Sequence, residues 1–108
     1  MHCLTRRIAP VMVAVGFALA RPALAETHTV TIQFFQFKPQ TVEVKAGDDI
    51  VFVNRDLIEH TATASNNAFD SKSIGAGQSW KWTARAPGEY DYVCAFHPTM
   101  KGVIKVAP

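Results

Sequence analysis

Short runs in which apolar and polar residues alternate are the feature that most restricts the fold of this chain. Val30, Ile32 and Phe34 alternate with polar side chains, and residues 79–83 repeat the pattern with two tryptophans. A period of two predicts β-strands that bury one face, and no segment shows a sustained helical period. The run at residues 49–54 is apolar at every interior position, so we expect that strand to be covered on both faces.

Turn-forming residues separate these runs. Glycine or proline occurs at residues 46–49, 75–77 and 86–89, each time next to an alternating run. Six or seven short strands with frequent turns predict an all-β fold, a sandwich or small barrel in a single domain. Residues 64–73 form the least regular segment, and we expect them to lie on the surface.

The N-terminus carries the features of an export signal. Two arginines precede a mostly apolar run at residues 8–20, and small residues then form a peptidase site that ends at Ala25. We therefore expect a signal peptide at residues 1–25, cleavage after Ala25, a domain at residues 26–108 and a periplasmic protein. The apolar run is too short to cross a bilayer, so we expect no stable membrane anchor.

Removal of the expected signal changes the charge of the chain. Residues 26–108 contain 8 Lys and Arg against 9 Asp and Glu, so their net charge is −1 rather than the +2 of the whole chain. No basic stripe remains on them. Binding to nucleic acid or to an anionic membrane surface is therefore not expected.

The cysteine count restricts the chemistry further. Cys3 leaves with the signal, so Cys94 is the one cysteine of residues 26–108 and no internal disulfide can form. In an exported protein such a cysteine indicates intermolecular pairing, a reactive thiol or a bound metal. Tyr90, Tyr92 and Cys94 share one face of an alternating run, so we expect the thiol to point inward.

Cys94, His97 and Met100 form a C-x-x-H-x-x-M motif, and a loop after the Cys94 strand could bring all three side chains to one point. His60 follows the apolar strand after a short loop and could reach the same end of a sandwich. Two histidines and a cysteine with a weak axial methionine are typical of blue-copper electron-transfer sites. Structural zinc sites usually have four Cys or His ligands. His28, beside the new terminus, is expected to be solvated.

Each of these residues also has an ordinary structural interpretation. A buried cysteine is often a small hydrophobic residue, and a methionine often fills a core. A histidine in a loop is often exposed to solvent. The combination of residue types within one short motif is what favours a metal site here.

The chain resembles the cupredoxins, most closely the amicyanin and plastocyanin-like branch, over about residues 29–106. The short Cys-x-x-His-x-x-Met spacing is similar to that of amicyanin rather than plastocyanin or azurin. The motifs that carry the resemblance are F-x-P at residues 37–39, V-x-A-G-D at 44–48, V-x-x-N-R-D at 51–56, HTAT at 60–63, FDS at 69–71, G-Q-S at 77–79 and PGEYDYVCAFHPTMKG at 87–102.

The resemblance implies a Greek-key β-sandwich and one copper ion that cycles between Cu2+ and Cu+. It implies that the copper ligands are His60, Cys94, His97 and Met100. Many relatives have Pro before the first histidine ligand and Asn after it, and that asparagine ties the two ligand loops together by hydrogen bonds. This chain has Glu59 and Thr61 at these positions, so a weaker tie between the loops is expected.

These observations lead to a small exported blue (type 1) copper protein, a monomer that shuttles single electrons between redox partners. The partners are expected to dock briefly on apolar residues around His97, namely Phe96, Pro98, Leu57 and Ile58. The alternatives are a periplasmic copper storage, delivery or resistance protein without an electron-carrier role, and a metal-free interaction domain. An enzyme is not expected, because four protein ligands leave no open position for a substrate.

Overall fold

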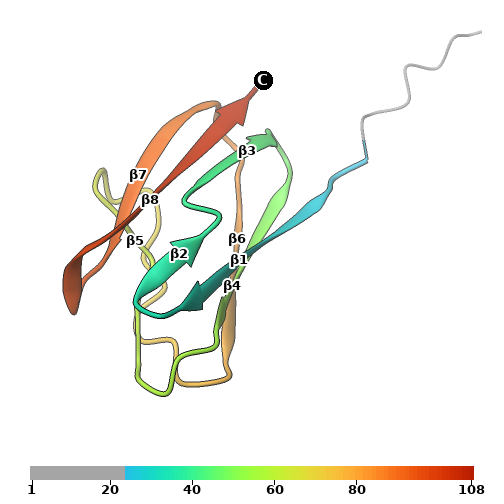
Figure 1. Cartoon of the computed structure of the whole chain (residues 1–108). Coiled ribbons are helices and arrows are strands. Elements are labelled where there is room, and N and C mark those ends of the chain that lie inside the picture. The colour runs from blue at the N-terminus through green and yellow to red at the C-terminus, as the bar shows by residue number, and fades with distance from the viewer. Residues whose placement is uncertain (1–23) are drawn as a thin grey trace, which may run out of the picture.

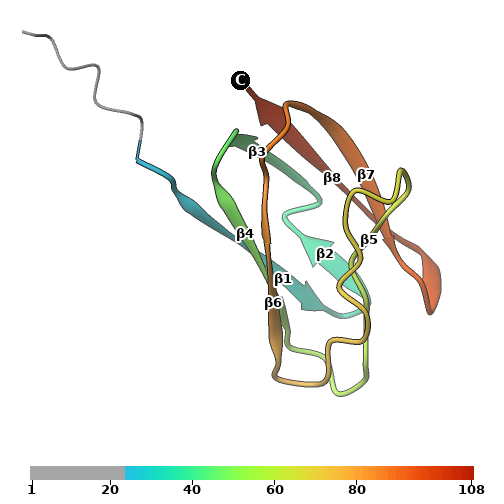
Figure 2. The same cartoon turned by 180° about the vertical axis from the view of Figure 1, so that it is seen from behind.

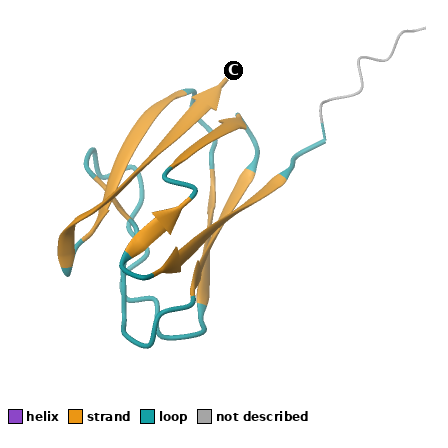
Figure 3. Ribbon diagram, in the orientation of Figure 1, coloured by secondary structure: helices purple, strands orange, loops and turns teal. Residues whose placement is uncertain are grey.

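The computed structural model describes residues 24–108, so all but the last two residues of the expected signal peptide lie outside the described part of the chain. The described residues form an all-β sandwich, as the alternation predicts (Figures 1 and 3). Its strands are β1 (Thr27–Gln33), β2 (Gln36–Lys38), β3 (Thr41–Lys45), β4 (Asp49–Asn54), β5 (Thr63–Ala64), β6 (Ser79–Thr83), β7 (Gly88–Cys94) and β8 (His97–Ala107).

The strands form two four-stranded sheets, in the orders β2-β1-β4-β6 and β3-β8-β7-β5. Consecutive strands often lie in different sheets, and the chain crosses between the layers repeatedly (Figure 2). Two neighbouring pairs, β1–β4 and β3–β8, are parallel, while the other paired strands are antiparallel. Within residues 24–108 there is no helix with the length and hydropathy that a membrane span needs.

The strand β4 differs from the sequence expectation. Ile50, Phe52 and Asn54 are fully buried between the sheets, but Val51 and Val53 are only partly covered. The expectation that both faces are covered is therefore wrong. The outer face of this sheet has no further layer of described residues over it, and β-branched side chains tolerate such half-buried positions.

The aromatic core contains one residue of the segment 64–73, all of which was expected to lie on the surface. This segment is largely on the surface, but Phe69 is buried, with its ring centroid 4.4 Å from that of Trp82. Tyr92 lies at the centre of the same core, and its phenol oxygen is buried without a hydrogen-bond partner among the described residues. Gly102 lies directly against the Tyr92 ring, where a Cβ would overlap ring atoms.

Two residues near the ends of β1 differ from expectation. Phe34 was expected to continue the buried face, but the strand ends at Gln33, the chain turns, and Phe34 is exposed. His28 was expected to be solvated, but it lies within β1, is only partly exposed, and its Nε2 is 3.0 Å from Asp48 Oδ2.

Candidate metal centre

Cys94 occupies the last position of β7, where alternation directs it inward. Tyr90, Tyr92 and Cys94 are all buried, which confirms the predicted face. The thiol forms no disulfide in the described chain. A buried thiol at a strand end is shielded from solvent and remains close to the turn that follows.

His97 approaches Cys94 through a tight turn rather than a long loop. Only Ala95 and Phe96 separate β7 from β8, and Cys94 pairs with His97 across the strands after a shift in register at Val93. The motif predicts a loop through residues 94–100, but in the structure the chain from His97 onwards belongs to β8. Strand pairing therefore fixes the backbone of His97 beside Cys94.

His60 lies at the end of a loop that Asn54 holds in place. The buried Asn54 amide donates hydrogen bonds to the carbonyl oxygens of Ile58 (2.8 Å) and Ile74 (2.9 Å). The backbone of His60 pairs with that of Ile74 in both directions, at 3.2 and 2.7 Å. These contacts bury His60 completely and direct it toward the end of β7.

The three side chains His60, Cys94 and His97, hereafter the Cys94 group, present their donor atoms to one point. The Nδ1 atoms of His60 and His97 lie 3.7 and 3.8 Å from Cys94 Sγ, and the three donor atoms all lie within 4.8 Å of one another. Metal bonds of about 2.3 Å to sulfur and about 2.0 Å to nitrogen, at a trigonal angle, give a sulfur–nitrogen spacing of about 3.7 Å. The spacing thus fits a trigonal site with one sulfur and two nitrogen donors.

Asp56 fixes the His60 ring. Its Oδ2 lies 2.8 Å from His60 Nε2, and because a carboxylate only accepts, Nε2 carries the proton and Nδ1 keeps its lone pair. Burial opposes ionisation of this carboxyl group, but hydrogen bonds from the backbone of Phe35 and Phe34 and from the His60 ring keep the pKa of Asp56 below its usual value. A charged group thus orients this imidazole, as carboxylates do for metal-binding histidines.

The same carboxylate supports an unusual turn. Phe34 and Phe35 form the two-residue turn between β1 and β2, with φ of 53° and 58°. Such turns usually contain Asn and Gly, since other residues seldom adopt positive φ. Both N–H groups donate to Asp56, at 2.7 and 3.0 Å, which offsets the conformational cost. The turn places Phe35 against the metal centre.

Thr61 connects the two segments that supply the donors. Its N–H donates to Cys94 Sγ at 3.3 Å, and its Oγ1 accepts a hydrogen bond from Ala95 N at 2.7 Å. A weaker hydrogen-bond link between the two ligand segments was expected with threonine at this position. The structure does not show it, because Thr61 Oγ1 accepts the hydrogen bond from Ala95 N. Glu59 is exposed and forms none of these contacts.

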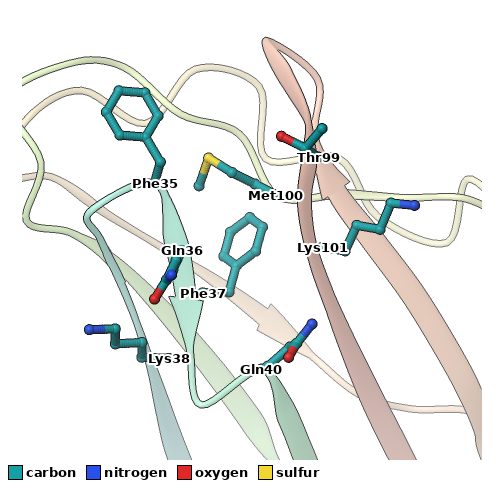
Figure 4. Close-up of a pocket in the computed structure, with 8 residues that line it drawn as sticks. All are labelled: Phe35, Gln36, Phe37, Lys38, Gln40, Thr99, Met100 and Lys101. Atoms are coloured by element: carbon teal, nitrogen blue, oxygen red, sulfur yellow. The ribbon is translucent and has the colours of Figure 1, made fainter.

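Met100 lies beside the Cys94 group. It is buried on β8 and, in Figure 4, its side chain extends from the strand with the sulfur toward Phe35. Both residues line one pocket. The centroid of the Phe35 ring is 5.3 Å from that of His60 and 5.0 Å from that of His97, both edge-on. Phe35 therefore connects the methionine side of the centre with the two imidazoles.

The predicted apolar residues around His97 are on the surface. Phe96, Leu57 and Ile58 are exposed large hydrophobic residues, Pro98 is exposed, and His97 is partly exposed. Phe34 and Phe35 add two exposed aromatic rings that the sequence analysis did not assign to this surface.

Sequence reasoning also missed Asp56 and Phe35 as parts of the site. The only local indications were the N-R-D motif, which ends at Asp56, and two adjacent phenylalanines that interrupt the alternation. Neither pattern reveals that a carboxylate 21 residues away caps the Phe35 N–H.

Comparisons with known proteins agree with this architecture. The family model of the cupredoxin-like domain matches residues 7–106. Amicyanin-alpha of Methylorubrum extorquens is 29% identical over 89 residues, which cover 78% of this chain and 75% of the relative. Amicyanin of Paracoccus versutus is 28% identical over 87 residues, which cover 76% of this chain and 66% of the relative.

Solved structures give the same result. A methionine-to-alanine variant of amicyanin in its Cu(I) form aligns with a TM-score of 0.69 and 25% identity, over 74% of this chain and 81% of that one. A Cu-containing nitrite reductase from Thermus scotoductus aligns with a TM-score of 0.71 and 30% identity, over 76% of this chain. The alignment spans only 22% of the reductase chain. From its sandwich, its matching family model and its relatives, the chain belongs to the cupredoxin-like domain family and is of the amicyanin type.

Proposed function

We propose that the protein is a blue (type 1) copper protein that binds one copper ion through His60, Cys94, His97 and Met100 and carries single electrons. The observation that supports this most directly is the trigonal spacing of the Cys94 group, 3.7 and 3.8 Å from sulfur to each nitrogen. The donor set is the one that blue-copper sites use, with a weak axial methionine. The amicyanin relatives support the same assignment.

The bound copper supplies one-electron chemistry between Cu2+ and Cu+. The residues of the chain supply rigidity. The N–H of Thr61 donates to the Cys94 sulfur and helps to hold it in position. Asp56 fixes the His60 ring, and β8 pairing fixes His97. Since these contacts within the chain hold the donors in position, the site would rearrange little when an electron arrives or leaves.

Partner proteins dock on the exposed apolar surface around His97, in this proposal. The proposed surface consists of the exposed residues Phe96, Pro98, Leu57 and Ile58, and it includes Phe35, whose ring lies edge-on against the partly exposed His97 ring. A small apolar surface suits short-lived complexes, which electron carriers need for turnover. An electron would leave through the His97 ring, because this ring joins the buried donors to the surface.

The same proposal includes export, with a signal peptide at residues 1–25, and a monomeric domain at residues 26–108 that acts in the periplasm as a carrier rather than an enzyme. Copper storage or delivery is the alternative use of the same donors. The complete burial of His60 and Cys94 favours retention of the ion over release.

The test is addition of Cu2+ to the purified processed protein, followed by visible spectroscopy. We expect intense thiolate-to-copper absorption that saturates with one copper at the Cys94 group, that is lost in Cys94→Ser and that is retained in the matched histidine control His28→Gln. Unchanged absorption in Cys94→Ser, or a colourless wild type that retains no copper, would contradict the proposal. Copper transfer to an apo-acceptor without redox turnover would favour the delivery alternative.

The docking surface has its own test. Phe96→Asp places a charge on this surface, so electron exchange with a redox partner should slow while the copper spectrum stays the same. Ala86→Asp adds the same charge at an exposed position between β6 and β7, away from the metal centre, and should leave the rate unchanged. If both variants slowed electron exchange equally, the surface around His97 would not be the docking site.

A further inference from the structure

A second group of donor side chains lies at the opposite end of the sandwich. Glu26, His28 and Asp48, hereafter the His28 group, present donor atoms that all lie within 4.8 Å of one another. They occur where the parallel strands β1 and β4 begin, with Thr27 paired to Asp49. Figure 1 shows the two strand starts together. The metal centre lies beyond the far end of β1, about 20 Å away at the rise of a β-strand.

We propose that the His28 group is a second metal site, which binds an exchangeable divalent first-row transition ion, with Cu2+ preferred. The donors are one imidazole nitrogen and two carboxylate oxygens. This set lacks sulfur, and nitrogen and oxygen donors in tetragonal arrangements are typical of Cu2+ and Ni2+. Among divalent ions of this row, Cu2+ binds such donors most strongly.

The donor spacing fits an ion. His28 Nε2 lies 3.0 Å from Asp48 Oδ2 and 4.0 Å from Glu26 Oε2. Two donors at right angles, each about 2.1 Å from a metal, are about 3.0 Å apart, and two donors opposite each other are about 4.2 Å apart. The distance from the imidazole to Asp48 therefore fits two donors at right angles about an ion. The distance to Glu26 is close to that of two donors on opposite sides of it. Binding replaces the proton on Nε2, which is released to solvent.

Asp48 gives the group a fixed anionic donor. It is buried, and its carboxylate accepts hydrogen bonds from the backbone of Lys45 and Glu26, each at 2.9 Å. These backbone bonds hold the carboxylate at a fixed position beside His28.

The charge of the group is unbalanced. Within residues 24–108 the only ion-pair partner of either carboxylate is His28, and neither pairs with a lysine or arginine side chain. Two carboxylates thus share one imidazole, which is neutral or singly charged. A divalent cation would balance this charge, since buried charges in proteins are paired or coordinate metals.

Processing before Glu26, part of the proposed function, would add a fourth donor. The Glu26 nitrogen lies 2.9 Å from Asp48 Oδ1 and would become a free α-amine. An α-amine titrates near pH 7.7–8.0 in general and loses its proton readily to a metal. The full set would then contain two nitrogen and two oxygen donors, while the exposure of Glu26 leaves room for water and for exchange of the ion.

The experiment is a Cu2+ titration of the purified processed protein, with wild type, His28→Gln and Glu26→Gln compared by bound copper per chain and by electron paramagnetic resonance. We expect one more copper in wild type than in His28→Gln, with a signal free of thiolate absorption. Glu43→Gln removes an exposed carboxylate elsewhere and serves as the control for Glu26→Gln. A protein that retains Ala25 has no free α-amine at Glu26 and should bind the second copper more weakly. If it bound this copper as strongly as the processed protein, the amine would not be a donor.

Equal numbers of bound copper ions in wild type and His28→Gln would overturn the proposal. If His28→Gln were also less stable than wild type, the His28 group would have only a structural role, holding the start of β1 in place. The difference between these two proteins does not depend on what the Cys94 group binds. Failure of the blue-copper assignment and failure of this second site are therefore separate results.

Discussion

The two ends of the sandwich carry donor groups of opposite character. In the Cys94 group a sulfur and two imidazoles are buried or nearly so, and they come from the ends of β7 and β8 and from a loop held by Asn54. In the His28 group two carboxylates and one imidazole lie at strand starts, and Glu26 is exposed. The Cys94 group is enclosed except for the partly exposed His97, whereas the His28 group has a buried Asp48 and reaches solvent through Glu26.

In our two proposals, one end of the fold retains its ion and the other end exchanges it. An enclosed donor set holds an ion in one geometry and excludes water, as electron transfer requires. An exposed set of carboxylates allows water and competing ligands to enter. The same β1 strand serves both ends, since His28 lies near its start and the Phe34–Phe35 turn follows its end.

Metal removal should give the largest contrast between the two ends. Brief treatment of fully copper-loaded protein with a water-soluble chelator is expected to remove the copper at the His28 group and leave the copper at the Cys94 group. The measurement is residual copper per chain together with the visible spectrum. Loss of the thiolate absorption before loss of the second copper would reverse the assignment of the two ends.

Asp56→Asn should have the next largest effect and acts only at the Cys94 end. The variant replaces a charged acceptor of three hydrogen bonds, and we expect the free energy of unfolding of the metal-free protein to fall by about 3 kcal/mol. Urea unfolding measures the change. Asp70→Asn, at a more exposed carboxylate, is the control and should cost less than about 1 kcal/mol. Equal losses in the two variants would mean that Asp56 does not organise the turn.

Thr61→Val tests the link between the two donor segments. The variant keeps the shape of the side chain but removes the acceptor of the Ala95 N–H, so we expect a loss of about 1–2 kcal/mol and a shifted visible spectrum. Thr61→Ser retains the oxygen and should restore the spectrum. A normal spectrum in Thr61→Val would show that other contacts fix the distance between Cys94 and His60.

Acid unfolding should show the smallest difference, and it reports on the His28 end. The folded pKa of Asp48 is about 2, below its ordinary value of 3.8. The contribution of Asp48 to stability is therefore complete above about pH 4 and is lost as pH falls through 2. In metal-free protein, Asp48→Asn should flatten the fall in stability between these pH values. Urea unfolding at a series of pH values would detect the change, and an unaltered slope would exclude this role.

Much of the fold followed from periodicity, and the exceptions have identifiable causes. The period of two predicted β1, β6 and β7 and the inward direction of Cys94, and the continuous apolar run at residues 49–54 predicted β4. It did not predict that β8 begins at His97, because histidine, proline and methionine do not form a strand pattern. Pairing with β7 creates that strand. Phe34 points outward because a carboxylate 22 residues away satisfies the turn.

Sequence alone determined the kinds of donor that this protein has and the alternation that places Cys94 inside. Tertiary structure alone decided which donors meet. His60 and Cys94 are 34 residues apart, and His28 and Asp48 are 20 residues apart. The reason is physical: side-chain periodicity acts over a few residues, whereas the distance between separate segments depends on strand pairing and on the packing of the two sheets.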